Sequence, residues 1–374
     1  MLTLIKKRNV KVLILKKVKN LVTIPRSIYH YKKGSLTLPY MPHTVWIEPT
    51  NICNLKCIMC PNSVITQKNP GFMPMGLYKK IIDEGKNFIS SAVLCLAGEP
   101  LLHKDLAKMV RYAEENGIDT MISTNGTTMT KKTSEKILRA GLNWINFSFD
   151  GCSKEVYEKI RVGADFEKTI GNIIDFLRIK KRLNAKTKTE IQILVMDEKG
   201  QQDFDKNISK FKEYFKGLPL DNIQVRQPST WGGVLYGTNK YRYKKLGLVY
   251  SPCSYLWSSM HFLWDGTVVA CTTDFWGKNA LGKFPEQSIK EIWNGEKFQK
   301  FRKAMQEKKY GNFFEYCDKC DSLWSEKILG LPSGIRGVSA FAFSYVFGLS
   351  SVNILKKLAE KLNYNFVMKS VTKK

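Results

Sequence analysis

Short hydrophobic runs alternate with amphipathic segments over the first two-thirds of the chain. Six runs rich in β-branched and aromatic residues predict strands, at residues 44–48, 92–97, 119–124, 144–149, 190–196 and 222–226. The segments between them, such as 77–89 and 166–179, repeat apolar residues at spacings of three and four, which predicts helices that bury one face. Strands that alternate with helices pair in parallel, so the pattern predicts an α/β fold.

A different pattern begins after Pro228. Two β-rich runs at 261–264 and 267–272 flank Asp265 and Gly266. An Asp-Gly pair between two such runs is the strongest short-range signal of a β-hairpin. Residues 288–305 follow with a helical pattern. We therefore expect a small second unit built from a hairpin and a helix.

The charge of the chain is strongly positive. Lys and Arg number 60 against 33 Asp and Glu, a formal net charge of +27. This excess favours partners that carry phosphate groups, or an anionic membrane surface. Residues 1–43 include many basic residues and no acidic one, and we predict a basic N-terminal arm there. With 43% hydrophobic and 25% charged residues, the chain has the composition of a globular protein.

Nine cysteines are present, an odd number that argues against a closed set of disulfides. The first residues do not resemble a secretory signal, so we expect a cytoplasmic protein with reduced thiols. Cys53, Cys57 and Cys60 directly follow the first predicted strand. Three thiolates on one loop suit three irons of a cubane cluster. The alternative is part of a zinc site.

A second group of four cysteines lies in the C-terminal half: Cys253, Cys271, Cys317 and Cys320. The last two form a C-x-x-C pair. Four thiolates suit either an iron-sulfur cluster or a zinc ribbon, and the spacing alone leaves both open. The two remaining cysteines, Cys95 and Cys152, are expected to be small core residues.

The loop EPTNICNLKCIMCPNS resembles the signature of the radical S-adenosylmethionine (radical SAM) superfamily, and the resemblance extends over residues 44–229. It implies a partial (β/α)6 TIM-like barrel. It also implies a 4Fe-4S cluster, held by Cys53, Cys57 and Cys60, whose open iron binds S-adenosylmethionine. Further motifs at the ends of the next three strands, with one arginine downstream, are similar to the cofactor-binding positions of that superfamily. These positions are Gly98, Glu99, Pro100, Ser123, Asn125, Ser148, Asp150 and Arg161.

The resemblance also implies individual roles. Glu99 would bind the amino group of the methionine part of the cofactor, and Arg161 would pair with its carboxylate. Two positions depart from the usual pattern. Ala97 stands where the first glycine of the GGEP motif is expected, and Met59 stands where an aromatic residue is common.

Residues 251–323 resemble the SPASM domain, in the shortened single-cluster form called twitch. The resemblance implies one auxiliary 4Fe-4S cluster at the second group of cysteines. Together with the arm and the tail that composition predicts, it divides the chain into four parts: a basic arm at 1–43, a radical SAM partial barrel at 44–230, a SPASM/twitch-like domain of a β-hairpin and a helix at 231–330, and a hydrophobic and basic tail at 331–374.

The implied activity is reductive cleavage of S-adenosylmethionine to a deoxyadenosyl radical that removes a hydrogen atom from a substrate. A single auxiliary cluster favours a two-electron oxidation of a sugar, a glycolipid or another alcohol, with that cluster as electron acceptor and Arg226 as the predicted catalytic residue. The electron would come from a reductant such as ferredoxin or flavodoxin. The alternatives are a peptide maturase and a non-catalytic protein that binds iron-sulfur clusters or nucleic acid. Nucleic acid is not expected, because no pair of stacking aromatics accompanies the basic residues.

Both ends of the chain predict peripheral contact with a membrane. Residues 2–24 place Leu, Ile and Val among seven basic residues, a pattern typical of an amphipathic helix on an anionic surface. Residues 337–355 are uncharged, but their Ser, Gly and Asn content makes them poorly apolar for a span. The alternative is that both ends pack on the protein with their lysines in water.

Overall fold

The computed structural model describes residues 23, 25–64, 69–226, 228–234, 248–325, 327–328 and 331–332. The two segments predicted to contact a membrane, 2–24 and 337–355, lie outside the described residues except for residue 23. Among the described residues, no helix is both long and apolar enough to cross a membrane.

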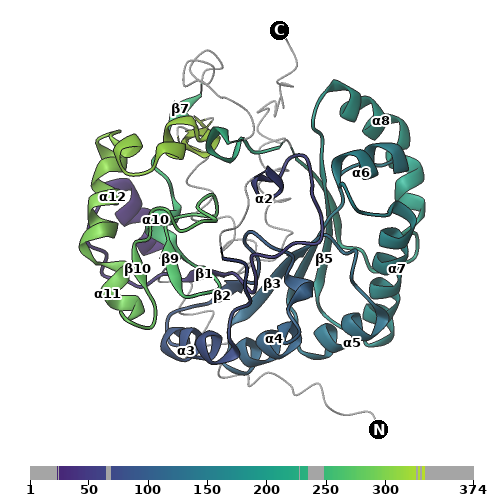
Figure 1. Ribbon diagram of the computed structural model, residues 1–374, viewed down its shortest axis with the longest axis horizontal. Coiled ribbons are helices and arrows are strands. Elements are labelled where there is room, and N and C mark those ends of the chain that lie inside the picture. The colour runs from purple at the N-terminus through teal and green to yellow at the C-terminus, as the bar shows by residue number, and fades with distance from the viewer. Residues whose placement is uncertain are drawn as a thin grey trace.

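Six parallel strands form the centre of the fold and follow one another in sequence order across the sheet. They are β1 Thr44–Ile47, β2 Ser91–Val93, β3 Asp119–Thr124, β4 Trp144–Ser148, β5 Lys188–Leu194 and β6 Asn222–Arg226. The sheet curves without closing (Figure 1), so the predicted α/β fold with a partial barrel is confirmed. The second strand ends earlier than predicted, because the chain turns away after Val93 toward Gly98.

Helices cover the outer face of the curved sheet (Figure 1). They are α3 Met75–Gly85, α4 Leu106–Glu115, α5 Lys131–Arg139, α6 Lys154–Ile160, α7 Phe166–Arg182 and α8 Glu198–Glu213. The short α2 Pro61–Val64 follows the first cysteines and lies apart from this layer (Figure 1). Alternate strand residues such as Val45, Ile122, Ile145 and Ile191 are fully buried in the core that these helices close. Because side chains alternate along a strand, their neighbours in sequence point to the opposite, concave face.

The predicted hairpin extends the same sheet. Its strands are β8 Ser259–Phe262 and β9 Thr267–Val269, followed by β10 Gly282–Lys283. β8 pairs in parallel with β1, so the described sheet has nine strands in the order β10-β9-β8-β1-β2-β3-β4-β5-β6. The hairpin is therefore part of the wall of the barrel, and one hydrophobic core runs through both regions.

The predicted helix at 288–305 is two helices, α11 Ile289–Trp293 and α12 Glu296–Gln306. The break falls at Asn294 and Gly295, where Gly295 is the extended N-cap of α12. Asn294 uses its side chain to bind the backbone of Leu38 at 2.9 Å in both directions. Asn is disfavoured in the interior of a helix, and here its side chain makes a tertiary contact at the break between two helices.

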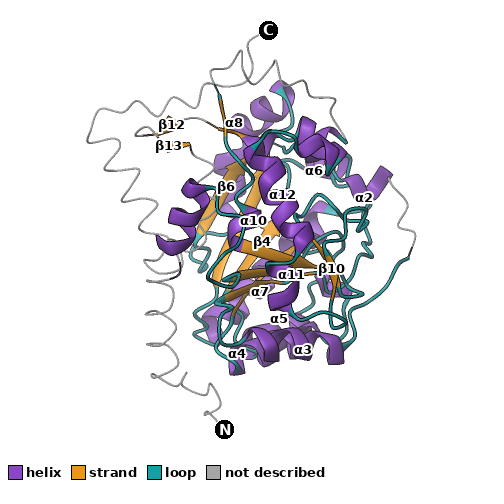
Figure 2. Ribbon diagram, turned by 90° about the vertical axis from the view of Figure 1, so that its left-hand side faces the viewer, coloured by secondary structure: helices purple, strands orange, loops and turns teal. Residues whose placement is uncertain are grey.

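Short elements complete the C-terminal region (Figure 2). They are α10 Tyr255–Ser258, the 3-10 turns η2 Trp231–Gly233, η3 Tyr310–Asn312, η4 Glu315–Lys319 and η5 Asp321–Leu323, and the strands β7 Val249–Tyr250, β11 Trp324–Ser325, β12 Lys327–Ile328 and β13 Leu331–Pro332. One further 3-10 turn, η1 Pro100–Leu102, lies between β2 and α4. β7 pairs with β11, and β12 with β13. The first of these pairings brings the chain near Cys253 against the chain near Cys320.

The second half of the predicted arm packs against this C-terminal region. Residues 25–33 are helical, and Tyr31 donates or accepts a hydrogen bond with Ser251 at 2.7 Å. The buried guanidinium of Arg302 donates to the carbonyl oxygens of Leu36, Leu256 and Trp293 at 2.7 to 2.9 Å. Arg302 therefore ties residues near 36 to α10 and α11.

Candidate functional site

The cysteine loop, residues 53–60, follows β1 and runs beside the segment after α6. The backbone N–H groups of Lys56 and Ile58 donate to the carbonyl oxygens of Val162 and Ile160, each over 3.0 Å. Side chains alternate along the loop, so Lys56 and Ile58 are exposed whereas Cys57 between them is buried. The two backbone bonds therefore hold the Cys57 thiol toward the interior.

Burial disfavours ionisation of the three thiols of the loop. It raises the pKa of Cys53 to about 11 and also raises the pKa values of Cys57 and Cys60. Arg161 opposes the rise at Cys57 and Cys60, and its Nη1 lies 3.8 Å from Cys57 Sγ. Three soft donors beside one guanidinium fit a metal cluster, because a bound metal supplies the positive charge that keeps a thiol deprotonated.

The loop after β2 meets the chain just before the cysteine loop at Gly98. A Cβ atom at Gly98 would lie 2.3 Å from the carbonyl oxygen of Thr50 and 2.5 Å from that of Ile52. The next residue, Glu99, donates its backbone N–H to the Ile52 carbonyl over 2.9 Å. Only glycine allows this approach, and it sets the Glu99 side chain beside the cysteine loop.

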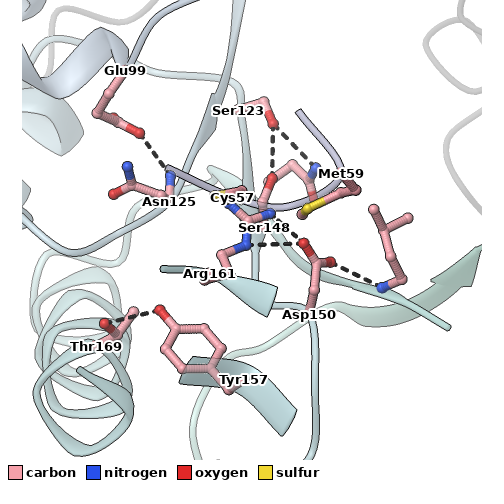
Figure 3. Close-up of polar contacts among 12 residues, drawn as sticks. Cys57, Met59, Glu99, Ser123, Asn125, Ser148, Asp150, Tyr157, Arg161 and Thr169 are labelled. Atoms are coloured by element: carbon pink, nitrogen blue, oxygen red, sulfur yellow. Dashed lines mark hydrogen bonds and ion pairs between the residues drawn. The ribbon is translucent and has the colours of Figure 1, made fainter. Parts of the chain in front are cut away.

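The buried carboxylate of Glu99 joins this loop to the end of β3 (Figure 3). Oε1 accepts from Leu101 N at 3.0 Å and from Thr124 Oγ1 at 2.7 Å, and Oε2 accepts from Asn125 N at 2.8 Å. A carboxylate has about four acceptor positions, so the described residues leave one for a further donor such as an ammonium group. Pro100 is buried and begins η1.

The polar residues at the ends of β3 and β4 approach one another. Asn125 Nδ2 donates to Asn54 Oδ1 in the cysteine loop over 3.0 Å. Ser123 Oγ and Ser148 Oγ lie 3.4 Å apart, and Asn146 Nδ2 donates to Ser123 Oγ over 3.4 Å (Figure 3). The structure therefore brings Ser123, Asn125 and Ser148 to one end of the sheet, the carboxyl end where barrel enzymes build their sites.

Arg161 and Asp150 form a buried ion pair beside Cys57 (Figure 3). Arg161 Nε donates to Asp150 Oδ2 over 2.9 Å, and the other oxygen of Asp150 accepts from Leu194 N over 2.9 Å. Burial by itself would lower the pKa of Arg161. Asp150 and Cys57 raise the pKa by more than burial lowers it, so the guanidinium stays charged. The resemblance implied that Arg161 pairs with the carboxylate of the cofactor, and the structure shows that its guanidinium also binds Asp150.

The second group of thiols also lies close together. Burial is the main cause that raises the pKa of all four, to about 12 for Cys320, and repulsion from neighbouring thiolates of the group adds to the rise at Cys253, Cys317 and Cys320. Cys317 is buried and the other three are partly buried. Four such thiols can be deprotonated together only beside a cation, so this donor set also fits a metal centre. Among the described residues, no three His, Cys, Asp or Glu side chains converge as they would around a single ion. The cysteines of a cubane cluster bind different irons, so their sulfurs need not converge on one atom.

A short turn connects the two groups of cysteines. Trp231, in η2, donates its Nε1 hydrogen to the carbonyl oxygen of Met59 over 3.1 Å. Its neighbour Thr230 donates its backbone N–H to Asp321, beside Cys320, over 3.0 Å. This turn therefore contacts both the cysteine loop and the C-x-x-C segment.

Arg226 ends β6 and is exposed. Although the residue as a whole is exposed, partial desolvation of its guanidinium lowers its pKa, and Glu190 on the neighbouring strand opposes this effect. Glu190 is buried, accepts a hydrogen bond from Asn222 at 3.3 Å, and has a pKa raised by burial. The predicted catalytic residue thus lies near a buried carboxylate that the sequence analysis did not single out.

An aromatic group on the concave face was also missed. His261 of β8 stacks on Trp46 of β1 with ring centroids 6.0 Å apart, and Tyr255 meets it edge-on at 5.0 Å. His261 is fully buried, and neither ring nitrogen makes a hydrogen bond of good geometry with the described residues. Burial lowers its pKa to about 3, with a small opposing effect from the backbone of Val269, so the imidazole is neutral at pH 7. No local motif marks it, because the pairing of β8 with β1 places it.

Two family models match the chain, and each covers one group of cysteines. The radical SAM superfamily model matches residues 47–210, and the model of an iron-sulfur cluster-binding domain, SPASM, matches residues 253–321. The chain is a radical SAM enzyme with a SPASM domain. This radical SAM enzyme therefore binds a 4Fe-4S cluster and S-adenosylmethionine through its first domain, and its SPASM domain is a module for auxiliary clusters.

The enzyme is similar to proteins that act on different substrates. It is 24% identical to an AdoMet-dependent heme synthase of Methanosarcina barkeri, over 75% of this chain and 90% of the relative. It is 34% identical to an Fe-coproporphyrin III synthase of the same organism, over 32% of this chain and only 30% of the relative. The structure of Streptococcus suis SuiB bound to its precursor peptide SuiA aligns over 74% of this chain and 69% of that chain, with a TM-score of 0.55 and 15% identity. That last likeness concerns the fold.

Proposed function

We propose that this radical SAM enzyme oxidises a small polar substrate by two electrons, at an alcohol group of a sugar, a glycolipid or another alcohol. The observation that carries the proposal is the polar character of the concave face of the sheet. His261 and the Oδ1 atom of Asn146 are buried there, and neither makes a hydrogen bond of good geometry with the described residues.

The two orphan groups restrict the chemistry of the substrate. Buried polar atoms in native proteins almost always have partners, so atoms without one in a ligand-binding enzyme point to the ligand. Asn146 Oδ1 is an acceptor, so the substrate must bring a donor. A neutral imidazole both donates and accepts. A hydroxyl group satisfies either residue, whereas a carboxylate would repel Asn146 Oδ1.

The chain also supplies groups for the steps that follow removal of a hydrogen atom. Bound S-adenosylmethionine and its cluster supply a carbon radical that removes one hydrogen atom from a C–H bond. An alcohol then becomes a carbonyl group if it also loses one proton and one electron. Glu190, whose pKa burial raises, is suited to accept the proton beside Arg226. Tyr255 contacts the His261 ring, and its pKa is raised by burial and in part by cysteines of the second group, so we assign the electron to an auxiliary cluster held by that group.

We also propose which residues bind the radical SAM cluster and S-adenosylmethionine. Cys53, Cys57 and Cys60 are proposed to hold the radical SAM cluster. The remaining acceptor position on Glu99 is proposed to receive the amino group of S-adenosylmethionine. Arg161 is proposed to keep the Cys57 thiolate charged.

The test is anaerobic incubation of the reconstituted enzyme with a strong reductant and deuterated candidates, followed by mass spectrometry of the deoxyadenosine product. We expect deuterium in deoxyadenosine with a carbon-deuterated sugar or other polyol and none with deuterated peptides. Transfer from a peptide alone would contradict the proposal. That result would favour the second candidate, a peptide maturase, which the likeness to peptide-bound SuiB keeps in view.

A further inference from the structure

The turn between the two groups of cysteines has unusual backbone angles. Trp231, Gly232 and Gly233 have φ angles of 48°, 64° and 81°, in the left-handed region. Glycine adopts this region freely, whereas the backbone of a bulky residue such as tryptophan is strained there. Such strain persists only where surrounding contacts hold the chain, and it is concentrated at functional sites. The contacts of this turn therefore show what it is held against.

On one side, the indole of Trp231 holds the peptide group that precedes Cys60. Its Nε1 hydrogen is donated to the Met59 carbonyl oxygen over 3.1 Å. The N–H of the same peptide group, which belongs to Cys60, donates to the Cys57 carbonyl oxygen over 3.1 Å. Both polar atoms of this peptide group are therefore bonded, and the orientation of the Cys60 backbone depends in part on Trp231.

On the other side, segments of the second group of cysteines hold the turn. The Trp231 ring packs against the buried Phe275, four residues after Cys271, with ring centroids 5.3 Å apart. Thr230 donates its backbone N–H over 3.0 Å to Asp321, the residue that follows the C-x-x-C pair. The strained residue is thus fixed by both halves of the second group.

The two glycines of the turn allow it to lie directly on the C-x-x-C segment. A Cβ atom at Gly232 would lie 2.6 Å from the Cβ of Tyr316. One at Gly233 would lie 2.7 Å from the Cβ of Lys319. Tyr316 and Lys319 each directly precede a cysteine of the pair, so a shift of either cysteine moves the surface on which the turn rests.

We propose that Trp231 is a positioning residue that couples the two metal centres. A cluster on the second group of cysteines fixes the C-x-x-C segment, this segment holds the strained turn, and the turn orients Cys60 as a ligand of the first cluster. The inference goes beyond the proposed function and rests on its assignment of ligands. Coupling between two binding sites is reciprocal, so loss of the second centre should weaken the first.

The experiment measures how fast the first cluster loses iron to bathophenanthroline disulfonate in the full-length, anaerobically reconstituted enzyme. The first cluster is followed by the change that S-adenosylmethionine causes in the EPR spectrum of the reduced protein. Trp231→Phe keeps a ring against Phe275 but loses the indole N–H, so we expect iron loss about fivefold faster than in the wild type. The matched control is Trp293→Phe, which also loses an indole hydrogen bond to a carbonyl oxygen, that of Tyr40 at 2.8 Å. Its rate should stay within about twofold of the wild type, because it lies outside the coupled elements.

A double-mutant cycle tests the coupling itself. The pair Cys317→Ala and Cys320→Ala removes the second centre and should speed iron loss from the first by about fivefold or more. Addition of Trp231→Phe to this pair should change the rate by less than about twofold, because the turn is already released.

A second pair of variants leaves the indole intact. Gly232→Ala drives a Cβ atom into Tyr316 and should also speed iron loss by about fivefold, because it forces the turn away from the C-x-x-C segment. Its control is Gly217→Ala. Gly217 has a φ of 72°, so the backbone strain is similar, but no atom lies within 4 Å of the new Cβ. This control should behave as the wild type.

An unchanged rate in Trp231→Phe overturns the proposal. An effect of Trp231→Phe that is equally large with and without the second centre also overturns it, because Trp231 would then act only within the cysteine loop. Equal effects in Trp231→Phe and Trp293→Phe would show a general loosening of the fold and count against it in the same way. A wild type that holds no iron at the first group of cysteines would instead contradict the proposed ligands, and the coupling with them.

Discussion

His261 shows what a single residue can reveal about the site. A fully buried imidazole without a good hydrogen bond costs stability, and a protein that needed only packing could place a phenylalanine between Trp46 and Tyr255. Proteins retain such groups mainly where function requires them. We therefore attribute the presence of this destabilising imidazole to its proposed contact with a substrate.

His261→Phe should raise the free energy of unfolding by about 1 kcal/mol, because it removes an unsatisfied buried polar group and keeps a ring of similar shape. The measurement is denaturant unfolding of the reconstituted protein under anaerobic conditions. Tyr78→Phe is the control. Tyr78 is equally buried, but its hydroxyl donates to the Met109 carbonyl over 2.9 Å, so its loss should lower the same free energy by about 1 kcal/mol. A clear loss of stability in His261→Phe would mean that the imidazole has a structural partner.

The buried ion pair between Arg161 and Asp150 should contribute strongly to the stability of the folded protein. Arg161→Met leaves Asp150 as a buried carboxylate without its cation and should lower the free energy of unfolding by about 3 kcal/mol. The double variant with Asp150→Leu should recover part of that loss. As a control, Arg139→Met breaks an exposed pair with Glu135 and should cost under about 1 kcal/mol. Equal costs for Arg161→Met and Arg139→Met, read from parallel unfolding curves, would contradict the assignment.

At the scale of elements, the Glu48 side chain connects the end of β1 with the loop after β2 and with the hairpin of β8 and β9. Its carboxylate accepts from the backbone N–H of Ala97, in the loop of Gly98, at 3.2 Å and from that of Trp264, in the hairpin, at 3.1 Å. The side chain is fully buried, and burial raises its pKa to about 7 although both hydrogen bonds oppose the rise. One carboxylate thus links the proposed cofactor loop to the hairpin that carries His261.

The raised pKa of Glu48 predicts a dependence of stability on pH. The folded protein binds this proton more tightly than the unfolded chain, so the contribution is complete below the unfolded pKa of about 4.5 and is lost as the pH rises to about 7. Thermal unfolding between pH 5.5 and 8 should show stability that falls with pH in the wild type. Glu48→Gln does not titrate, so its curve should fall less over this range. Parallel curves for the two proteins would contradict the raised pKa.

The elements also show how far the sequence could predict the fold. The strands at 119–124 and 222–226 have the predicted bounds, because local hydrophobic runs define them. The break between α11 and α12 was missed because a distant contact from Leu38 uses Asn294. The attachment of β8 to β1 was missed for a similar reason: pairing between strands about 200 residues apart leaves no mark on the local pattern. His261 and Glu48 obtain their roles from that pairing, so no motif could identify them. The cysteines, in contrast, were recognisable from their spacing, and Gly98 from the resemblance of its segment to the GGEP motif.

At the scale of the whole molecule, the structure places two groups of buried and partly buried thiols around one continuous core. In the turn at Trp231, the Trp231 side chain contacts the cysteine loop, and the backbone of Thr230 contacts Asp321, next to the C-x-x-C segment. In the sheet, β8 lies between β9 of the hairpin and β1, the strand that leads into the cysteine loop. His261 is on the concave face of β8. This arrangement suits an enzyme that generates a radical at one centre and delivers an electron to another.

The central claim is that the two groups of cysteines hold two separate iron-sulfur centres and that only the first cleaves the cofactor. The most direct measurement is iron, sulfide and zinc analysis, together with deoxyadenosine release, for the wild type and for the triple variant Cys53→Ala, Cys57→Ala and Cys60→Ala after anaerobic reconstitution. The account predicts about eight irons per chain in the wild type, about four in the triple variant, no zinc in either, and no deoxyadenosine from the variant. Cofactor cleavage that survives in the triple variant, or zinc in place of the second four irons, would contradict it.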